Sequence, residues 1–182
     1  MTDLVTDVLR LPEVARIAFG FGSVLIGPTS FPLVVNALAA SKISIVTVTG
    51  GGNRAVYNYK RNRFTFSFTV ALGDPDREAL VVHESVHAAF DVMISPMQVK
   101  VSEAAAYIAQ CQFFYFRNQA AIDAGAAPTF GDPILAAAWP VSQLALTRPR
   151  LDEADVAALL STISGHRIYR LRHSEIDEYD GV

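Results

Sequence analysis

Residues 74–93 read DPDREALVVHESVHAAFDVM, and the interpretation of the rest of the chain starts from this stretch. It opens with Asp74, an acid suited to cap a helix, and with Pro75, which fits the first helical position. No further glycine or proline follows within it, and apolar residues lie on most sides, as in a buried helix. We therefore predict a helix from about Pro75 to Met93, ended by Pro96.

Within this predicted helix, His83, Glu84 and His87 form the pattern H-E-x-x-H. Positions i and i+4 lie on one helix face, about 5–6 Å apart at Cβ, so both imidazoles can bind a single metal ion. Glu84 is turned roughly 100° from His83, where it can reach a water molecule beside the ion without binding the ion itself. Burying three such groups without partners would cost several kcal/mol, which favours a metal site over a chance match.

A second long helix, predicted over residues 102–124, could supply a third ligand. It contains no glycine or proline and is rich in alanine, phenylalanine and isoleucine. Ser102 is suited to the N-cap position, which would place Glu103 in the first turn. The alanines at 104–106 would let this helix approach the first one closely. We therefore expect Glu103 to face the two histidines.

Residues 74–112 resemble the gluzincin class of zinc metallopeptidases, in which H-E-x-x-H on one helix is followed by a glutamate that starts the next. The resemblance implies that zinc is the cofactor and that it is bound by His83, His87 and Glu103. It also implies that Glu84 is the general base that activates water.

The chain departs from the related metzincin pattern, because Phe90 stands where that pattern has glycine and Met93 where it has a third histidine. No G-T-x-D segment follows, which argues against an aspartate as the third ligand. Four residues still compete with Glu103 for this role: Asp91, Asp132, His166 and His173.

Spacing in the sequence predicts two helper residues, which would assist the metal ligands or the reaction without binding the metal. Asp91 lies four residues after His87, so it could accept a hydrogen bond from a ligand imidazole. Tyr107 lies four residues after Glu103, and its hydroxyl could stabilise the oxyanion of an attacked carbonyl. His166 and Tyr169 are alternatives for the same role, and the sequence does not rank them.

Length and composition point to one domain of 182 residues with a sizeable core, since 51% of the residues are hydrophobic. A net charge of −3 gives no electrostatic case for a nucleic-acid partner. The single cysteine, Cys111, cannot form an internal disulfide, and we find no signal-peptide pattern or membrane-spanning stretch. We expect a cytoplasmic protein with no membrane partner; export without a signal peptide is the alternative.

The predicted fold is α+β: a small antiparallel or mixed sheet followed by a zincin-type active-site helix and further packed helices. The single domain is expected to have four consecutive parts, namely N-terminal helices (1–42), a sheet (43–70), the metal-binding helices (74–125) and a C-terminal helical part (126–182). By analogy with the zincin plan, the strand over 64–70 or its neighbour would be the edge that pairs with an extended substrate.

Local patterns give finer expectations for each part. Helices are expected at 3–19, 30–40, 134–138 and 151–164, strands at 43–49, 55–59 and 64–70, and a turn at 50–53. Pro12 should break or restart the first of these helices, and Pro140 should interrupt the third. The acidic tail at 174–182 is expected to be frayed.

Together these patterns predict a zinc metallopeptidase that acts on a peptide or protein substrate. One alternative keeps the site but gives it a non-peptide amide as substrate, or places it in a secreted toxin or effector domain. Another class of alternative is a catalytically inert, metal-stabilised binding protein. The sequence leaves the oligomeric state open.

Overall fold

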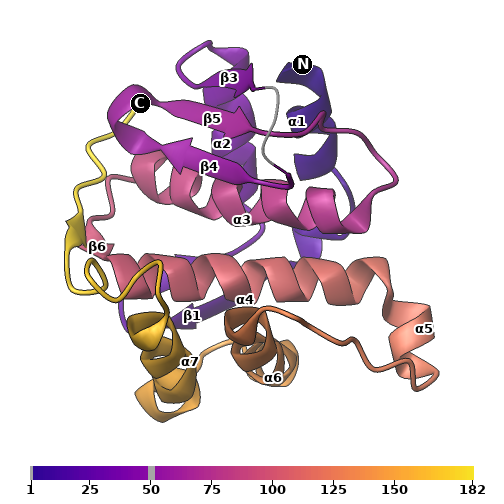
Figure 1. The fold of residues 1–182 in the computed structure, drawn as a ribbon. Helices are drawn as coiled ribbons and strands as arrows, with labels where there is room; N and C mark the ends of the chain where they lie inside the picture. The colour runs from indigo at the N-terminus through magenta and orange to yellow at the C-terminus, as the bar shows by residue number, and fades with distance from the viewer. Residues whose placement is uncertain (1, 49–51) are drawn as a thin grey trace.

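Two long helices, α3 (Pro75–Val92) and α4 (Val99–Arg117), cross the centre of the molecule in opposite directions (Figure 1). A computed structural model describes residues 2–48 and 52–182. The sheet and the N-terminal helices lie on the α3 side of this pair, and the C-terminal helices lie on the α4 side. The α+β class expected from the sequence is confirmed.

The N-terminal part contains α1 (Thr2–Leu9), a short 3₁₀ helix η1 (Val14–Arg16), a hairpin of β1 (Phe19–Phe21) and β2 (Val24–Ile26), and α2 (Ser30–Ala39). The α2 helix confirms the prediction for residues 30–40. The helix predicted over 3–19 ends at Leu9, and only the 3₁₀ helix η1 follows Pro12, the residue expected to break or restart it. In the hairpin, a Cβ at Gly20 would lie 2.9 Å from both the Arg150 guanidinium and the Val24 carbonyl oxygen. The hairpin therefore needs glycine at this position.

The sheet contains β3 (Ser44–Thr47), β4 (Ala55–Asn58) and β5 (Arg63–Phe66), with a 3₁₀ helix η2 (Tyr59–Arg61) between the last two. Its order is β3-β5-β4, with β3 parallel and β4 antiparallel to β5, so it is the mixed sheet that was predicted. The central strand is β5, whose Phe64 and Phe66 are fully buried. The candidate edge is therefore its neighbour β4. Residues 50 and 51 of the predicted turn at 50–53 lie outside the described residues.

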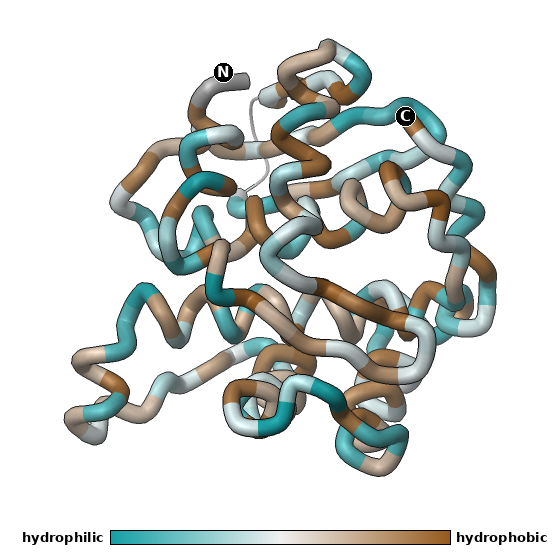
Figure 2. The backbone as a smooth tube through the Cα atoms, turned by 180° about the vertical axis from the view of Figure 1, so that it is seen from behind, coloured by the Kyte–Doolittle hydropathy of each residue, from teal (hydrophilic) through white to brown (hydrophobic). Residues whose placement is uncertain are grey.

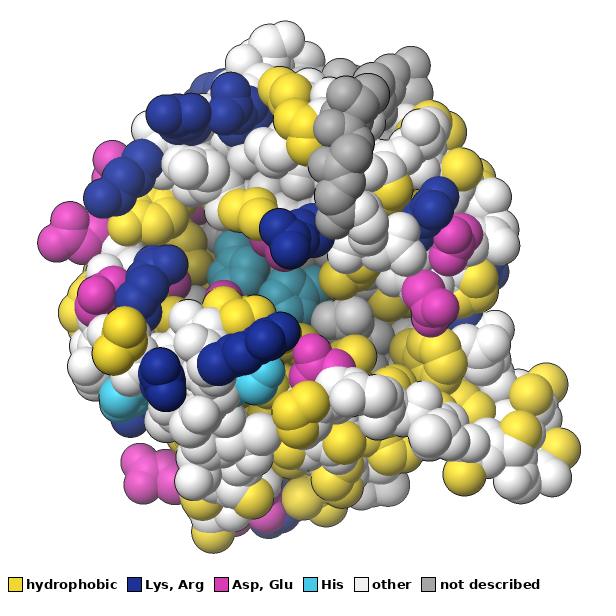
Figure 3. All heavy atoms as spheres, viewed as in Figure 1, with side chains coloured by type: hydrophobic (Ala, Val, Ile, Leu, Met, Phe, Trp, Pro, Cys, Tyr) yellow, Lys and Arg dark blue, Asp and Glu magenta, His cyan; other side chains and the backbone are white. Residues whose placement is uncertain are grey.

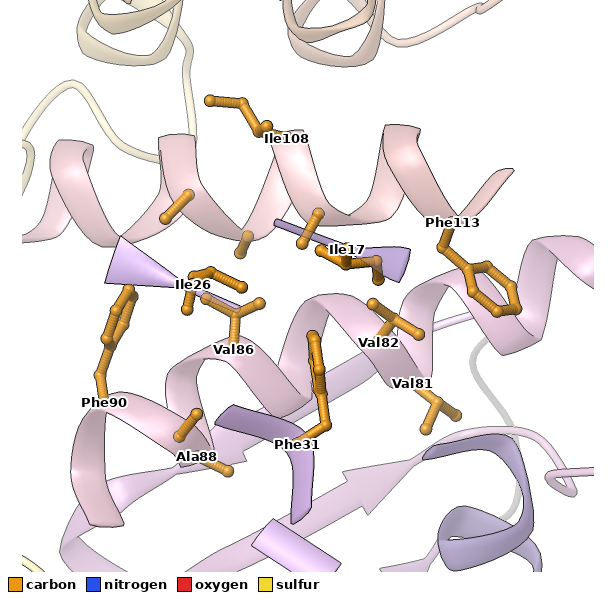
Figure 4. Packing of buried hydrophobic residues seen from close by; sticks show 14 of the residues in the cluster. Ile17, Ile26, Phe31, Val81, Val82, Val86, Ala88, Phe90, Ile108 and Phe113 are labelled. Carbon is orange, nitrogen blue, oxygen red and sulfur yellow. The ribbon is translucent and has the colours of Figure 1, made fainter. Parts of the chain in front are cut away.

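The α3 helix forms where the sequence predicted it. The Asp74 carboxylate accepts a hydrogen bond from the Arg77 amide, and Pro75 occupies the first turn. Val82 and Val86 point from α3 toward α4 and the β1–β2 hairpin, together with Phe31 of α2 (Figure 4). Seen from behind, hydrophobic stretches alternate with hydrophilic ones along the described chain (Figure 2). Most residues of α3 from Glu78 to Asp91 are buried, so this helix is enclosed by the core.

The α4 helix begins earlier than predicted. Residues Met97–Gln98 form a short strand, β6, and the helix starts directly after it at Val99. Ser102 is therefore no N-cap; its buried hydroxyl lies 3.0 Å from Oδ2 of Asp177 and 3.2 Å from the Val99 carbonyl oxygen. Glu103 consequently lies in the second turn. The helix ends at Arg117, and a separate helix α5 (Gln119–Asp123) follows.

The C-terminal part contains α6 (Pro133–Thr147), α7 (Glu153–Gly165) and a short strand β7 (Ile176–Asp177). The α7 helix was predicted, but α6 continues through Pro140, contrary to the expected break. The prediction of a frayed tail is wrong, because β7 pairs with β6 and the Tyr179 side chain is only 3% exposed. Among the described residues, no helix combines the length and apolar character needed to cross a bilayer.

Close packing of α4 gives a first test. Ala105 is fully buried, so Ala105→Leu should destabilise the protein by about 1–3 kcal/mol, because added methylenes in a packed core force side chains and backbone to shift. Ala157, exposed on α7, provides the control, and Ala157→Leu should change stability by less than about 0.5 kcal/mol. Urea unfolding measures both; equal stabilities would show that α4 tolerates larger side chains.

Candidate metal centre

His83, His87 and Glu103 converge at the interface of α3 and α4. The Nε2 atom of His83 lies 3.5 Å from Oε2 of Glu103, and Nε2 of His87 lies 3.8 Å from Oε1 of the same carboxylate. One donor atom from each residue lies within 4.8 Å of the other two, so the three could hold one metal ion. Within the described part of the chain, no other cluster of histidine, cysteine and acidic side chains meets this condition.

Helix geometry brings these three groups together. His83 and His87 are four residues apart on α3 and therefore share one face. The α4 helix runs alongside, and the fully buried Ala104, Ala105 and Ala106 follow Glu103 on it. Small side chains allow the helices to approach, which lets a glutamate of α4 reach imidazoles of α3.

Each imidazole uses its other nitrogen for a buried hydrogen bond. Nδ1 of His83 lies 2.9 Å from the side-chain oxygen of Gln110, and Nδ1 of His87 lies 3.1 Å from the Tyr179 hydroxyl. An amide oxygen only accepts, so His83 must carry a proton on Nδ1. Both Nε2 atoms then face Glu103. Outer partners of this kind orient metal-binding histidines and fix their tautomers.

The donor set fits a divalent cation. Two neutral Nε2 lone pairs that face carboxylate oxygens at 3.5 and 3.8 Å repel one another unless positive charge lies between them. Without a metal, a proton provides part of this charge. Burial lowers the pKa of His83, but the hydrogen bond to Glu103 and the charge of Glu84 outweigh it and raise this pKa. Two imidazoles and a carboxylate are typical ligands for zinc.

The pKa values of the other two candidate ligands suit metal binding at neutral pH. Burial lowers the pKa of His87 to about 4, so this imidazole is neutral. Burial raises the pKa of Glu103, but the neighbouring histidines outweigh it, and the net pKa is lowered. Glu103 is therefore ionised, and His83 is the one candidate ligand whose shifted pKa favours the protonated form.

Glu84 lies beside the cluster but is oriented differently. Its Oε2 atom accepts a hydrogen bond of 2.6 Å from the backbone amide of Tyr57 in β4. Burial is the largest cause that raises the pKa of Glu84, to about 7. A carboxylate with a pKa of about 7, next to three candidate metal ligands, has a pKa suited to a general base.

The cluster opens onto a cavity of about 430 Å³. The strand β4 and the 3₁₀ helix η2 form one wall, α3 and α4 form the base, and residues between Ile168 and Tyr179 form the other wall. Figure 3 shows histidine side chains at the bottom of this hollow, with lysine and arginine side chains around its mouth. The site is therefore accessible from solvent, although His83 and His87 are only 6% and 8% exposed.

The other candidate third ligands lie elsewhere. Asp132 caps α6 by accepting a hydrogen bond from the Ile134 amide. His173 bonds to the Arg170 carbonyl through Nδ1. Neither these residues nor Asp91 and His166 belong to the cluster. Of the five residues considered from sequence, the structure brings only Glu103 to the two histidines.

The predicted helper residues have mixed outcomes. Asp91 does not contact His87 and instead accepts hydrogen bonds from the Tyr57 hydroxyl at 2.6 Å and the Gly181 amide at 3.1 Å. Tyr107 packs edge-on against the His83 ring, with the ring centres 4.6 Å apart. It is not among the residues that line the cavity, whereas Tyr169 is. The Tyr169 hydroxyl donates to Oε2 of Glu103 at 3.0 Å.

Three site residues were missed from the sequence. Gln110 could have been found, because it lies seven residues after Glu103 and so shares its helix face. Tyr57 and Tyr179 gave no signal of this kind, since they reach the site from a strand and from an irregular tail far away in sequence.

Burial of Glu84 predicts a cost in stability. Because its folded pKa of about 7 exceeds the ordinary value of 4.5, the folded state loses stability as pH rises from about 4.5 to 7. In metal-free protein at pH 8, Glu84→Gln should therefore increase the free energy of unfolding by about 1–3 kcal/mol. The gain should shrink toward zero near pH 5. Urea unfolding with a chelator present measures it, and a pH-independent difference would contradict this origin.

Comparison of the chain with models of protein families, with curated proteins and with solved structures finds no match. The function must therefore be argued from the geometry of the site.

Proposed function

We propose that this protein is a zinc-dependent hydrolase of peptide bonds. One observation carries the proposal: two buried imidazoles and a carboxylate converge next to a second carboxylate that lies outside the ligand set, at the base of an open cavity. A structural metal site is normally closed by four protein ligands, whereas three protein ligands leave a position for water or substrate. Three ligands with a neighbouring base therefore favour catalysis over a purely structural role.

The chemistry can be assigned to individual residues. Zinc held by His83, His87 and Glu103 would supply a Lewis acid that makes water acidic near neutral pH and polarises a carbonyl. Glu84 would accept the proton of the attacking water and pass it to the leaving nitrogen. A pKa of about 7 suits both steps, because the carboxylate is a better base than usual and its acid form is still available.

The cavity wall favours a peptide as the substrate. The strand β4 is an edge of the sheet and lines the cavity. Its Tyr57 amide points away from β5 toward Glu84, so alternate backbone groups of this edge face the cavity. An extended peptide could pair with such an edge and bring its carbonyl to the metal.

For the oxyanion donor, we favour Tyr169 over the other sequence candidates, Tyr107 and His166. The Tyr169 side chain lines the cavity, and its hydroxyl lies next to the carboxylate of Glu103. Tyr107 and His166 do not line the cavity. In the proposed reaction, Tyr169 would donate a hydrogen bond to the carbonyl oxygen as negative charge develops on it.

The central test uses Glu84→Gln. The amide keeps the shape of the side chain and can still accept from Tyr57, but it cannot take a proton. The variant should bind zinc like the wild type, by elemental analysis, and should cleave a mixed peptide library at least about 100-fold more slowly. Cleavage at the wild-type rate would contradict the mechanism. Zinc binding without any cleavage by the wild type would instead favour an inert, metal-stabilised binding protein.

Removal of a ligand tests the metal site itself. His87→Ala and Glu103→Ala should each lower zinc affinity strongly, because each removes one of three protein ligands. His173→Ala is the matched control, since this histidine lies outside the cluster and should leave affinity unchanged. Isothermal titration of metal-free protein with zinc gives the affinities. Undiminished affinity in Glu103→Ala would exclude Glu103 as a ligand.

A further inference from the structure

The C-terminal segment, residues 174–182, is part of the candidate metal centre. Its strand β7 pairs with β6, the short strand directly before α4. Beyond β7, the Gly181 amide donates to Oδ1 of Asp91 at 3.1 Å, and the Val182 carbonyl accepts from Lys42 at 3.2 Å. The segment is therefore fixed on both sides of Tyr179, the residue that reaches the site.

Tyr179 is placed by packing and by hydrogen bonds together. Its ring lies against Phe90 and Tyr59, with centroid distances of 6.0 and 5.4 Å. Its hydroxyl lies 3.1 Å from Nδ1 of His87 and 3.5 Å from Oδ2 of Asp177. Because packing holds the ring in place, the hydroxyl has little freedom. Its polar neighbours therefore determine whether it donates or accepts a hydrogen bond.

The direction of the hydrogen bonds of Tyr179 is argued from the Asp177 carboxylate, the last acceptor in the series. The Asp177 carboxylate only accepts when ionised, and it already accepts from Ser102 of α4 at 3.0 Å. A Tyr179 hydroxyl that donates to Asp177 at 3.5 Å leaves its oxygen to accept from Nδ1–H of His87 at 3.1 Å. In this arrangement the proton of His87 lies on Nδ1, and the Nε2 lone pair is free on the side of Glu103.

We infer that Tyr179 is a positioning residue, and that the C-terminal segment holds His87 in its metal-binding tautomer through the Tyr179–Asp177 pair. The inference rests on the metal site of the proposed function. It adds a coupling between metal binding and the docking of residues 174–182. Docking of the segment favours metal binding, so metal binding must favour docking by the same factor. The order of residues 174–182 is thus linked to the occupancy of the site.

The first experiment compares the wild type with Tyr179→Phe, which keeps the ring and removes the hydroxyl. Zn²⁺ is titrated into metal-free protein against a competing chelator, and the absorption spectrum of the Co²⁺-loaded protein is recorded. Affinity for Zn²⁺ should fall about 10–100-fold, as for other outer partners of metal ligands. The Co²⁺ spectrum should change, because the His87 ring is no longer held in one orientation.

Tyr115→Phe is the matched control. Tyr115 is also a tyrosine whose hydroxyl donates to a carboxylate, at 3.1 Å, but that carboxylate is Asp123 of α5, and neither residue lines the cavity or belongs to the cluster. This variant should keep the Zn²⁺ affinity and the Co²⁺ spectrum of the wild type. If Tyr179→Phe binds Zn²⁺ as tightly as the wild type with the same spectrum, the positioning role is overturned.

The coupling has its own measurement. Hydrogen exchange of the amides in residues 174–182 should slow when Zn²⁺ is added to the wild type, and the slowing should be smaller in Tyr179→Phe. Equal exchange with and without Zn²⁺ in a wild type that binds the metal would overturn the coupling. Failure of the wild type to bind Zn²⁺ at all would overturn the proposed function as well, so the two failures are distinguishable.

Discussion

The rest of the structure depends on one constraint. Several side chains that all present electron lone pairs to one another are buried between α3 and α4. Two imidazoles and a carboxylate lie with donor atoms within 4.8 Å of one another, and their side chains are mostly buried at the base of the cavity. Such a group is stable only if positive charge lies among its members, whether from a proton or from a metal ion. The helices meet closely because the residues beside Glu103 on α4 are alanines.

Burial of Glu84 makes its carboxylate a stronger base, as the proposed reaction requires, but lowers the free energy of unfolding at neutral pH. A carboxylate with an ordinary pKa would be a weak base at neutral pH, and burial corrects this by disfavouring the charged form. The single amide of Tyr57 offsets the effect only in part. The sheet edge therefore orients Glu84 without cancelling the shift on which the proposed proton transfer depends.

The site is assembled from three parts of the chain that are distant in sequence. The helix pair supplies the candidate ligands, the strand β4 supplies a wall and a backbone donor, and the C-terminal segment supplies Tyr179 and a second wall. Hydrogen bonds connect these parts around each ligand. The outer polar partners of His83 and His87 are the neutral side chains of Gln110 and Tyr179. The sequence had instead led us to expect a carboxylate, Asp91, in this role.

The sequence by itself determined the elements whose signals are local. The capped helix α3, the spacing of His83, Glu84 and His87 on it, and the alternation that buries one face of β5 all follow from short-range patterns of residues. Glu103 was also named, although α4 starts three residues before the expected N-cap. Only the tertiary structure decided the hairpin at Gly20, the order of the acidic tail and the place of Tyr179. These depend on contacts between segments far apart in sequence, which no local pattern encodes.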